Sequence, residues 1–87
     1  MIKPTIHMNG TAGMDLYALY VAAHEKLTQA IVAMTDAGPH ARDYYPQGDD
    51  AFRVAAREHT ERLKSLVILR NEMETLALHC TRETHRK

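Results

Sequence analysis

One break divides this chain into two long helical patterns. Gly38 and Pro39 stand together near the middle of the sequence, and a glycine followed by a proline is a common stop signal for a helix. On both sides of this break apolar residues recur at three- and four-residue spacing, which is the period of an amphipathic helix. We therefore predict an all-α fold in which two helices pair as an antiparallel helical hairpin.

Turn and capping signals set the limits of the elements within one domain over residues 1–87. We predict five elements, namely an extended N-terminal lead-in over 1–11, a first helix over 12–37, a loop over 38–48, a second helix over 49–82 and a tail over 83–87. Thr11 can cap the first helix through its hydroxyl, and Asp49 or Asp50 can cap the second through a carboxylate. The second helix is the longer of the two.

This difference in length predicts where the lead-in lies. We expect the second helix to extend past the start of the first, and the lead-in to lie along the overhang. His7, Asn9 and Thr11 would then lie beside the C-terminal part of the second helix. The loop lies at the far end of the hairpin, so one chain cannot unite these two ends. Antiparallel copies in an oligomer could bring them together.

The apolar surface indicates self-association. Hydrophobic residues make up 45% of the chain, which favours folding, yet two helices of this length cannot enclose a large core. Leu69 and Leu76 broaden the apolar stripe of the second helix beyond what one neighbouring helix covers. We therefore expect a homo-oligomeric bundle, with another copy of the chain as the simplest partner.

Charge and cysteine content exclude several classes of protein. Eleven basic and eleven acidic residues balance to a net charge of zero, whereas a protein that binds nucleic acid polymers usually carries a basic excess. The single cysteine, Cys80, rules out an internal disulfide and fits a reducing compartment. No signal peptide or membrane span is evident in the sequence. We expect a soluble protein of the cytoplasm with no membrane partner.

The loop carries more chemistry than a helix connector needs. Arg42, Tyr44 and Tyr45 stand in it, and loops with costly side chains are often functional. In one interpretation Arg42 pairs with Asp43 while the tyrosines hold the end of the hairpin together. In the other, Arg42 offers a fork to a phosphate or carboxylate and a tyrosine stacks beside it. We adopt the second, with His7, Asn9 and Thr11 of a neighbouring copy completing a ligand site.

The remaining candidate sites also have two interpretations. His7, His79 and Cys80 could suggest zinc, but they lack paired ligand spacing, and Cys80 fits a small buried hydrophobe. The histidines of the two helices, His24 and His59, fit core or interface positions better than a catalytic pair. The face that carries Tyr17, Tyr20 and His24 suits either core packing or a nucleobase. We predict no catalytic residue, no metal ligand and no cofactor, and therefore not an enzyme.

Two segments of the chain resemble a family of small phage and prophage proteins without assigned activity. The resemblance is carried by Ile6–Thr11, which reads IHMNGT, and by Arg42–Gly48, which reads RDYYPQG, with Ala51-Phe52 and Glu58-His59 following on the second helix. It covers nearly the whole chain. It implies a phage origin and a helical hairpin, but it supplies no catalytic residues.

Two functions are consistent with these features. The first is a non-enzymatic binding protein, a counter-defence factor that sequesters a small anionic ligand such as a nucleotide signal at subunit junctions. In size, helical content and predicted assembly the chain is similar to oligomeric phage proteins that act as sponges for cyclic nucleotides. The alternative is a protein–protein interaction module, an inhibitor or adaptor that binds a host protein through the outer face of the second helix.

Overall fold

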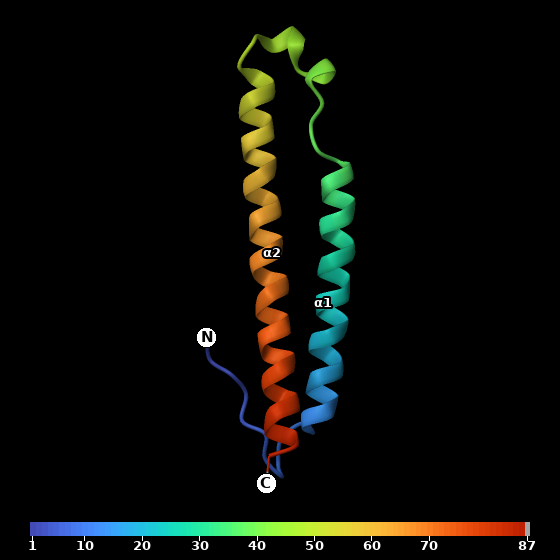
Figure 1. The fold of residues 1–87 in the computed structure, drawn as a ribbon, viewed down its shortest axis with the longest axis vertical. Coiled ribbons are helices and arrows are strands. Elements are labelled where there is room, and N and C mark those ends of the chain that lie inside the picture. The colour runs from blue at the N-terminus through green and yellow to red at the C-terminus, as the bar shows by residue number, and fades with distance from the viewer. Residues whose placement is uncertain (87) are drawn as a thin grey trace.

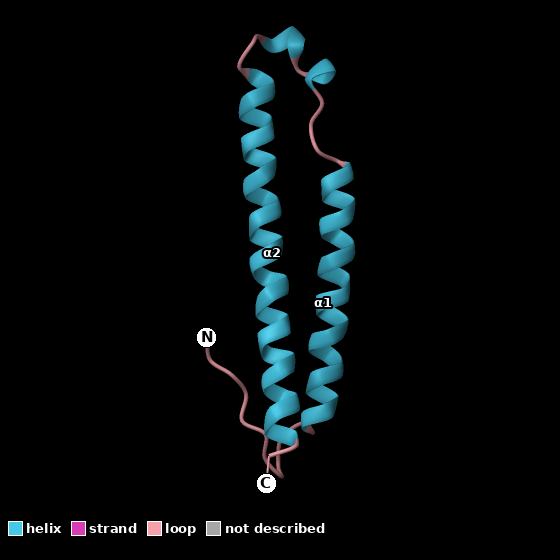
Figure 2. Cartoon of the chain, viewed as in Figure 1, coloured by secondary structure: helices cyan, strands magenta, loops and turns pink. Residues whose placement is uncertain are grey.

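A computed structural model describes residues 1–86 of the chain, and Lys87, the last residue of the predicted tail, lies outside the described residues. Two long helices, α1 (Gly13–Asp36) and α2 (Ala51–Thr84), are joined by two short 3₁₀ turns, η1 (Ala41–Asp43) and η2 (Tyr45–Gln47). Figures 1 and 2 show α1 and α2 side by side and antiparallel, with no strand in residues 1–86. The prediction of an all-α helical hairpin is confirmed.

The register of the two helices differs from the predicted one. Gly13, at the start of α1, is buried against Thr84, the last residue of α2, so these two ends are level. The expectation that α2 extends past the start of α1 is therefore wrong. α2 has 34 residues and α1 has 24. The ten extra residues of α2 lie at the connector end, where the segment that follows α1 runs beside the first turns of α2 (Figure 1).

Glycine at position 13 is the physical reason for this register. A Cβ atom at Gly13 would overlap the Thr84 hydroxyl and would lie 3.3 Å from Cγ2 of Ile6. The missing side chain lets the start of α1, the end of α2 and the lead-in converge at one point. Sequence length alone gives the size of the overhang but not the end at which it occurs.

The lead-in runs beside the C-terminal part of α2 before it turns into α1 (Figure 1). Nε2 of His79 lies 2.7 Å from the carbonyl oxygen of Pro4 and ties the two segments together. The chain then reverses, and the backbone N–H of Gly10 donates to the carbonyl of His7 at 3.1 Å. The lead-in thus follows α2 as predicted, but Pro4 contacts His79, whereas His7, Asn9 and Thr11 belong to the reversal.

Neither predicted helix cap forms. Ala12 occupies the position before α1 without a side-chain hydrogen bond, and Thr11 precedes it as an exposed residue. Asp50 does precede α2, but its carboxylate makes no capping bond and instead pairs with Arg53 in the first helical turn. An arginine three residues ahead competes with the backbone N–H groups for this carboxylate.

The hairpin has a thin core. Within residues 1–86 the only buried apolar residues are Ala77 and Cys80, and both lie near the C-terminal end of α2. Most other residues between α1 and α2 are only half-buried. Because a helix pair alone shields a narrow seam, most of the apolar surface stays partly accessible to solvent.

Candidate functional site

The connector has a defined backbone. In η1 the N–H groups of Asp43 and Tyr44 donate to the carbonyls of His40 and Ala41, each at 3.0 Å. In η2 the N–H of Gln47 donates to the carbonyl of Tyr44 at 2.9 Å. Gly48 follows with a φ of 110°, a conformation that favours glycine. These backbone hydrogen bonds define the positions from which the connector side chains extend.

Two of the three predicted connector residues face solvent. Arg42 is exposed and forms no ion pair with another side chain of the described chain. Tyr45 is 76% exposed, whereas Tyr44 is half-buried. The structural interpretation described a local Arg42–Asp43 pair and two tyrosines that hold the hairpin end together. The structure contains neither the pair nor a buried Tyr45.

The other three predicted site residues lie in and next to the reversal of the lead-in. His7, Asn9 and Thr11 are all exposed. A Cβ atom at Gly10 would lie 2.8 Å from Nε2 of His7, so the imidazole folds over its own turn. This turn offers two side-chain groups that can donate and accept hydrogen bonds, an amide and a hydroxyl, beside one imidazole.

A single chain does not bring the three connector residues close to the three lead-in residues. The molecule measures 62 × 20 × 17 Å, and the connector and the lead-in turn occupy opposite ends of its long axis (Figure 1). This separation agrees with the sequence-based expectation that a single hairpin holds only half of the predicted site.

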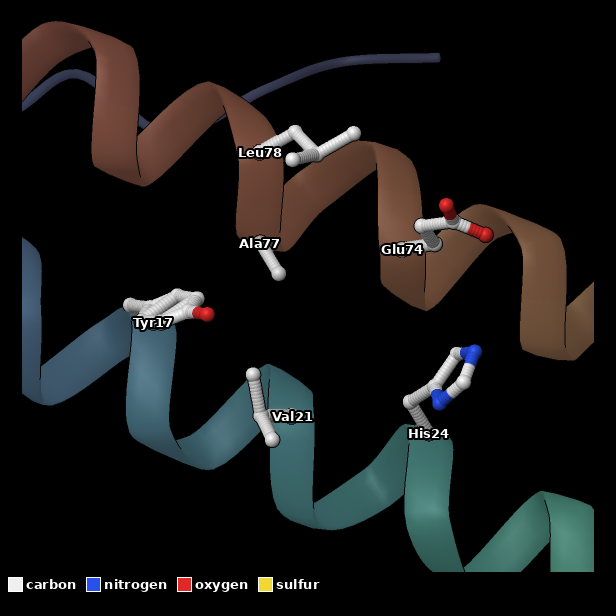
Figure 3. A pocket seen from close by; sticks show the side chains of 6 residues that line it. All are labelled: Tyr17, Val21, His24, Glu74, Ala77 and Leu78. Carbon is white, nitrogen blue, oxygen red and sulfur yellow. The ribbon is translucent and has the colours of Figure 1, made fainter.

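A shallow groove lies between the N-terminal half of α1 and the C-terminal half of α2 (Figure 3). It has a volume of about 280 Å³ and is lined by Tyr17, Val21, His24, Glu74, Ala77 and Leu78. The sequence singled out the face that carries Tyr17, Tyr20 and His24, and the groove includes the first and third of these but not Tyr20. Glu74 was not predicted, because its place opposite His24 depends on the register of the hairpin.

The chemistry of this groove is mixed. Val21, Ala77 and Leu78 supply apolar walls, while His24 of α1 and Glu74 of α2 lie on opposite sides of the groove, with the Glu74 carboxylate turned away from the imidazole (Figure 3). Ligand pockets usually enclose about 300–1,000 Å³. This groove is slightly smaller and open on one side, so it can accept an apolar side chain or one ring rather than enclose a whole ligand.

Two histidines have structural roles. Nε2 of His59 lies 2.5 Å from the carbonyl oxygen of Met34, and Nε2 of His79 is similarly placed at Pro4. Cys80 is fully buried, and this burial raises the pKa of its thiol. A buried neutral thiol is a poor nucleophile and a poor metal ligand. In residues 1–86 no three histidine, cysteine or acidic side chains are grouped closely enough to hold a metal ion.

Comparisons with known proteins identify no relative of this chain. No protein family, curated protein or solved structure matches the chain, so the resemblance to small phage proteins stays a prediction. Over residues 1–86 neither helix combines the length and the apolar character needed to cross a membrane.

Proposed function

We propose that this protein is a non-enzymatic binding protein that holds a small anionic ligand, such as a nucleotide, between copies of the hairpin. Arg42, Tyr44 and Tyr45 of one copy form one side of the site. His7, Asn9 and Thr11 of a neighbouring copy form the other. The observation that carries the proposal is the unpaired, outward-facing Arg42 beside an exposed Tyr45 on a connector of fixed backbone.

Arginine and tyrosine suit this class of ligand. A guanidinium presents two parallel N–H groups to a phosphate or carboxylate, and an aromatic ring stacks on a nucleobase. Asp43 is the acidic residue next to Arg42, but it does not pair with it, and the nearby Asp50 is occupied by Arg53. The fork of Arg42 is therefore available to an anion.

The resemblance to phage proteins supports a narrower form of the proposal. Both quoted segments, Ile6–Thr11 and Arg42–Gly48, coincide with the two exposed ends of the rod. If the chain is a phage protein, its ligand is a nucleotide signal of a host defence system, and the protein acts as a counter-defence factor by sequestering it in the host cytoplasm. This step is by analogy, since fold does not fix function.

Native mass spectrometry of protein purified from bacterial cells tests the proposal, together with thermal shifts measured against a panel of linear and cyclic nucleotides. Wild type is expected to retain or bind a nucleotide. Arg42→Ala is expected to lose it, while the melting temperature of the free protein stays the same. Arg57→Ala is the matched control, because Arg57 is also exposed but lies on α2. An Arg42→Ala protein that binds nucleotide as wild type does contradicts the proposal.

A second candidate is the protein–protein interaction module. Val54 and Ile68, spaced by two heptads on α2, are both exposed, and exposed apolar residues on one helix face can bind a partner protein. Capture of one host protein by wild type, its loss with Ile68→Glu and the absence of nucleotide binding would favour this function.

A further inference from the structure

The groove between α1 and α2 continues into a second hollow along α1. This adjoining hollow has a volume of about 620 Å³. It shares Val21 and His24 with the groove and is otherwise lined by Glu25, Thr28 and Gln29. From Tyr17 to Gln29 the two hollows follow α1 over about 18 Å, at roughly 1.5 Å for each residue. They therefore form one continuous trough on one side of the hairpin.

The trough has carboxylates but no basic side chain in its lining. Glu74 lines the groove and Glu25 lines the adjoining hollow, whereas no lysine or arginine of residues 1–86 lines either one. Three ion pairs form within the described chain, and neither Glu25 nor Glu74 belongs to them. Both glutamates are exposed. The lining of the trough thus carries unneutralised negative charge, although the whole chain has a net charge of zero.

Two basic residues that are close in sequence do not neutralise these carboxylates. Lys26 follows Glu25 directly, and Arg70 precedes Glu74 by about one turn of α2. Neither Lys26 nor Arg70 forms an ion pair with another described residue, and neither lines a hollow. Because a concave, partly apolar surface of one charge attracts ligands of the opposite sign, the trough favours a cation over an anion.

The walls of the groove suit an aromatic ring. The ring of Tyr17 lies at one end of the groove, and its hydroxyl points toward the space between Val21 and Ala77 (Figure 3). Leu78 is 49% exposed and adds apolar surface on the α2 side. A tyrosine ring also attracts a cation to its face. The groove therefore combines apolar walls, one aromatic ring and one exposed carboxylate, that of Glu74.

We propose that the groove binds a small aromatic amine, a single ring that carries an ammonium group on a short chain. The ring packs against Val21, Ala77 and Leu78. The ammonium group lies between His24 and Glu74, because a neutral imidazole accepts a hydrogen bond and the exposed Glu74 side chain can change rotamer to meet a cation. This site goes beyond the proposed function, since it shares no residue with the anion site and takes a ligand of opposite charge.

Chemical-shift titration of isotope-labelled protein tests the site with three probes that share one ring: benzylamine, benzyl alcohol and benzoate. Benzylamine is expected to shift the backbone amide signals of Val21 and Ala77. It should bind about 2- to 5-fold more tightly than benzyl alcohol, which is the effect of one exposed ion pair. Benzoate is expected to leave these two signals unchanged. The absence of a shift with benzylamine, or binding no tighter than that of benzyl alcohol, overturns the proposal.

Glu74→Gln tests the carboxylate with little change in side-chain size or stability. This variant is expected to lose the preference for benzylamine, while its affinity for benzyl alcohol stays the same. Glu58→Gln is the matched control and should bind as wild type does, because Glu58 is exposed on α2 but lines neither hollow. Arg42→Ala should also bind benzylamine as wild type does, which separates this site from the anion site. A preference for benzylamine that survives in Glu74→Gln, or that both glutamine variants lose equally, overturns the proposal.

Discussion

The imidazole of His59, in the first third of α2, reaches across the seam to the carbonyl oxygen of Met34 in the last turn of α1, with Nε2 at 2.5 Å. The last carbonyls of a helix have no partner within it. The neighbouring carbonyls of Ala33 and Thr35 accept from the N–H groups of Ala37 and Gly38. Since a carbonyl can only accept, His59 donates its Nε2–H, and this hydrogen bond links the two helices near the connector.

His59→Leu is expected to lower the free energy of unfolding by about 1–2 kcal/mol. Leucine fills a similar volume in the seam, but it leaves the Met34 carbonyl without a hydrogen-bond donor. His40→Leu is the matched control, since His40 is exposed in the connector, and it should change stability by less than about 0.5 kcal/mol. Urea denaturation measures both. Equal effects of the two substitutions would mean that the His59–Met34 hydrogen bond contributes no stability.

Gly13 should not tolerate a side chain while Thr84 is present. Gly13→Ala is expected to destabilise the hairpin by about 1–3 kcal/mol through overpacking, although alanine is the better helix former. Thr84→Ala alone should cost little, and in the double variant it should recover much of the loss because the overlapping hydroxyl is gone. A double-mutant cycle by thermal denaturation measures the coupling, and additive effects would show that the two ends do not approach each other as described.

The register is the part of the fold that the sequence did not predict. The period of the apolar residues and the Gly38-Pro39 break suffice for two antiparallel helices, because both are local signals. The end at which α2 overhangs depends on contacts between residues far apart in sequence, such as Gly13 with Thr84 and His59 with Met34. A glycine at the start of a helix is a signal of close approach, and it could have indicated this register.

The positions of the candidate site residues could also be predicted only where they depend on local sequence. The exposure of Arg42 and Tyr45 follows from a connector bounded by proline and glycine, which is local information. The Asp50 cap failed because Asp50 has a nearby arginine to pair with, a competition that propensity alone does not resolve. The placement of His24 and Glu74 on opposite sides of one groove depends on the register and could not be found without it.

The Cys80 thiol should be protected from reagents in the folded protein. It is fully buried and its pKa is raised by that burial, so alkylation at neutral pH should be much slower than after unfolding in urea. The unfolded chain loses the thiol proton first, near pH 8.5. Stability should therefore decline as pH rises above that value, and Cys80→Ala should reduce this decline. Rapid alkylation of the native protein would show that the end of α2 is open.

Substitutions of the two adjacent tyrosines should distinguish a loss of stability from a loss of nucleotide affinity. Tyr44 is half-buried, so Tyr44→Ala is expected to lower the free energy of unfolding by about 1–2 kcal/mol through lost burial. Tyr45 is 76% exposed, so Tyr45→Ala should change stability by less than about 0.5 kcal/mol.

If Tyr45 stacks on a nucleobase, Tyr45→Ala should weaken nucleotide binding by about 1–3 kcal/mol, or roughly 5- to 150-fold. Calorimetric titration with the nucleotide found by native mass spectrometry measures this loss, and Tyr45→Phe should retain most of the affinity. Unchanged affinity in Tyr45→Ala would remove Tyr45 from the proposed site and leave Arg42 as its only outward-facing connector group.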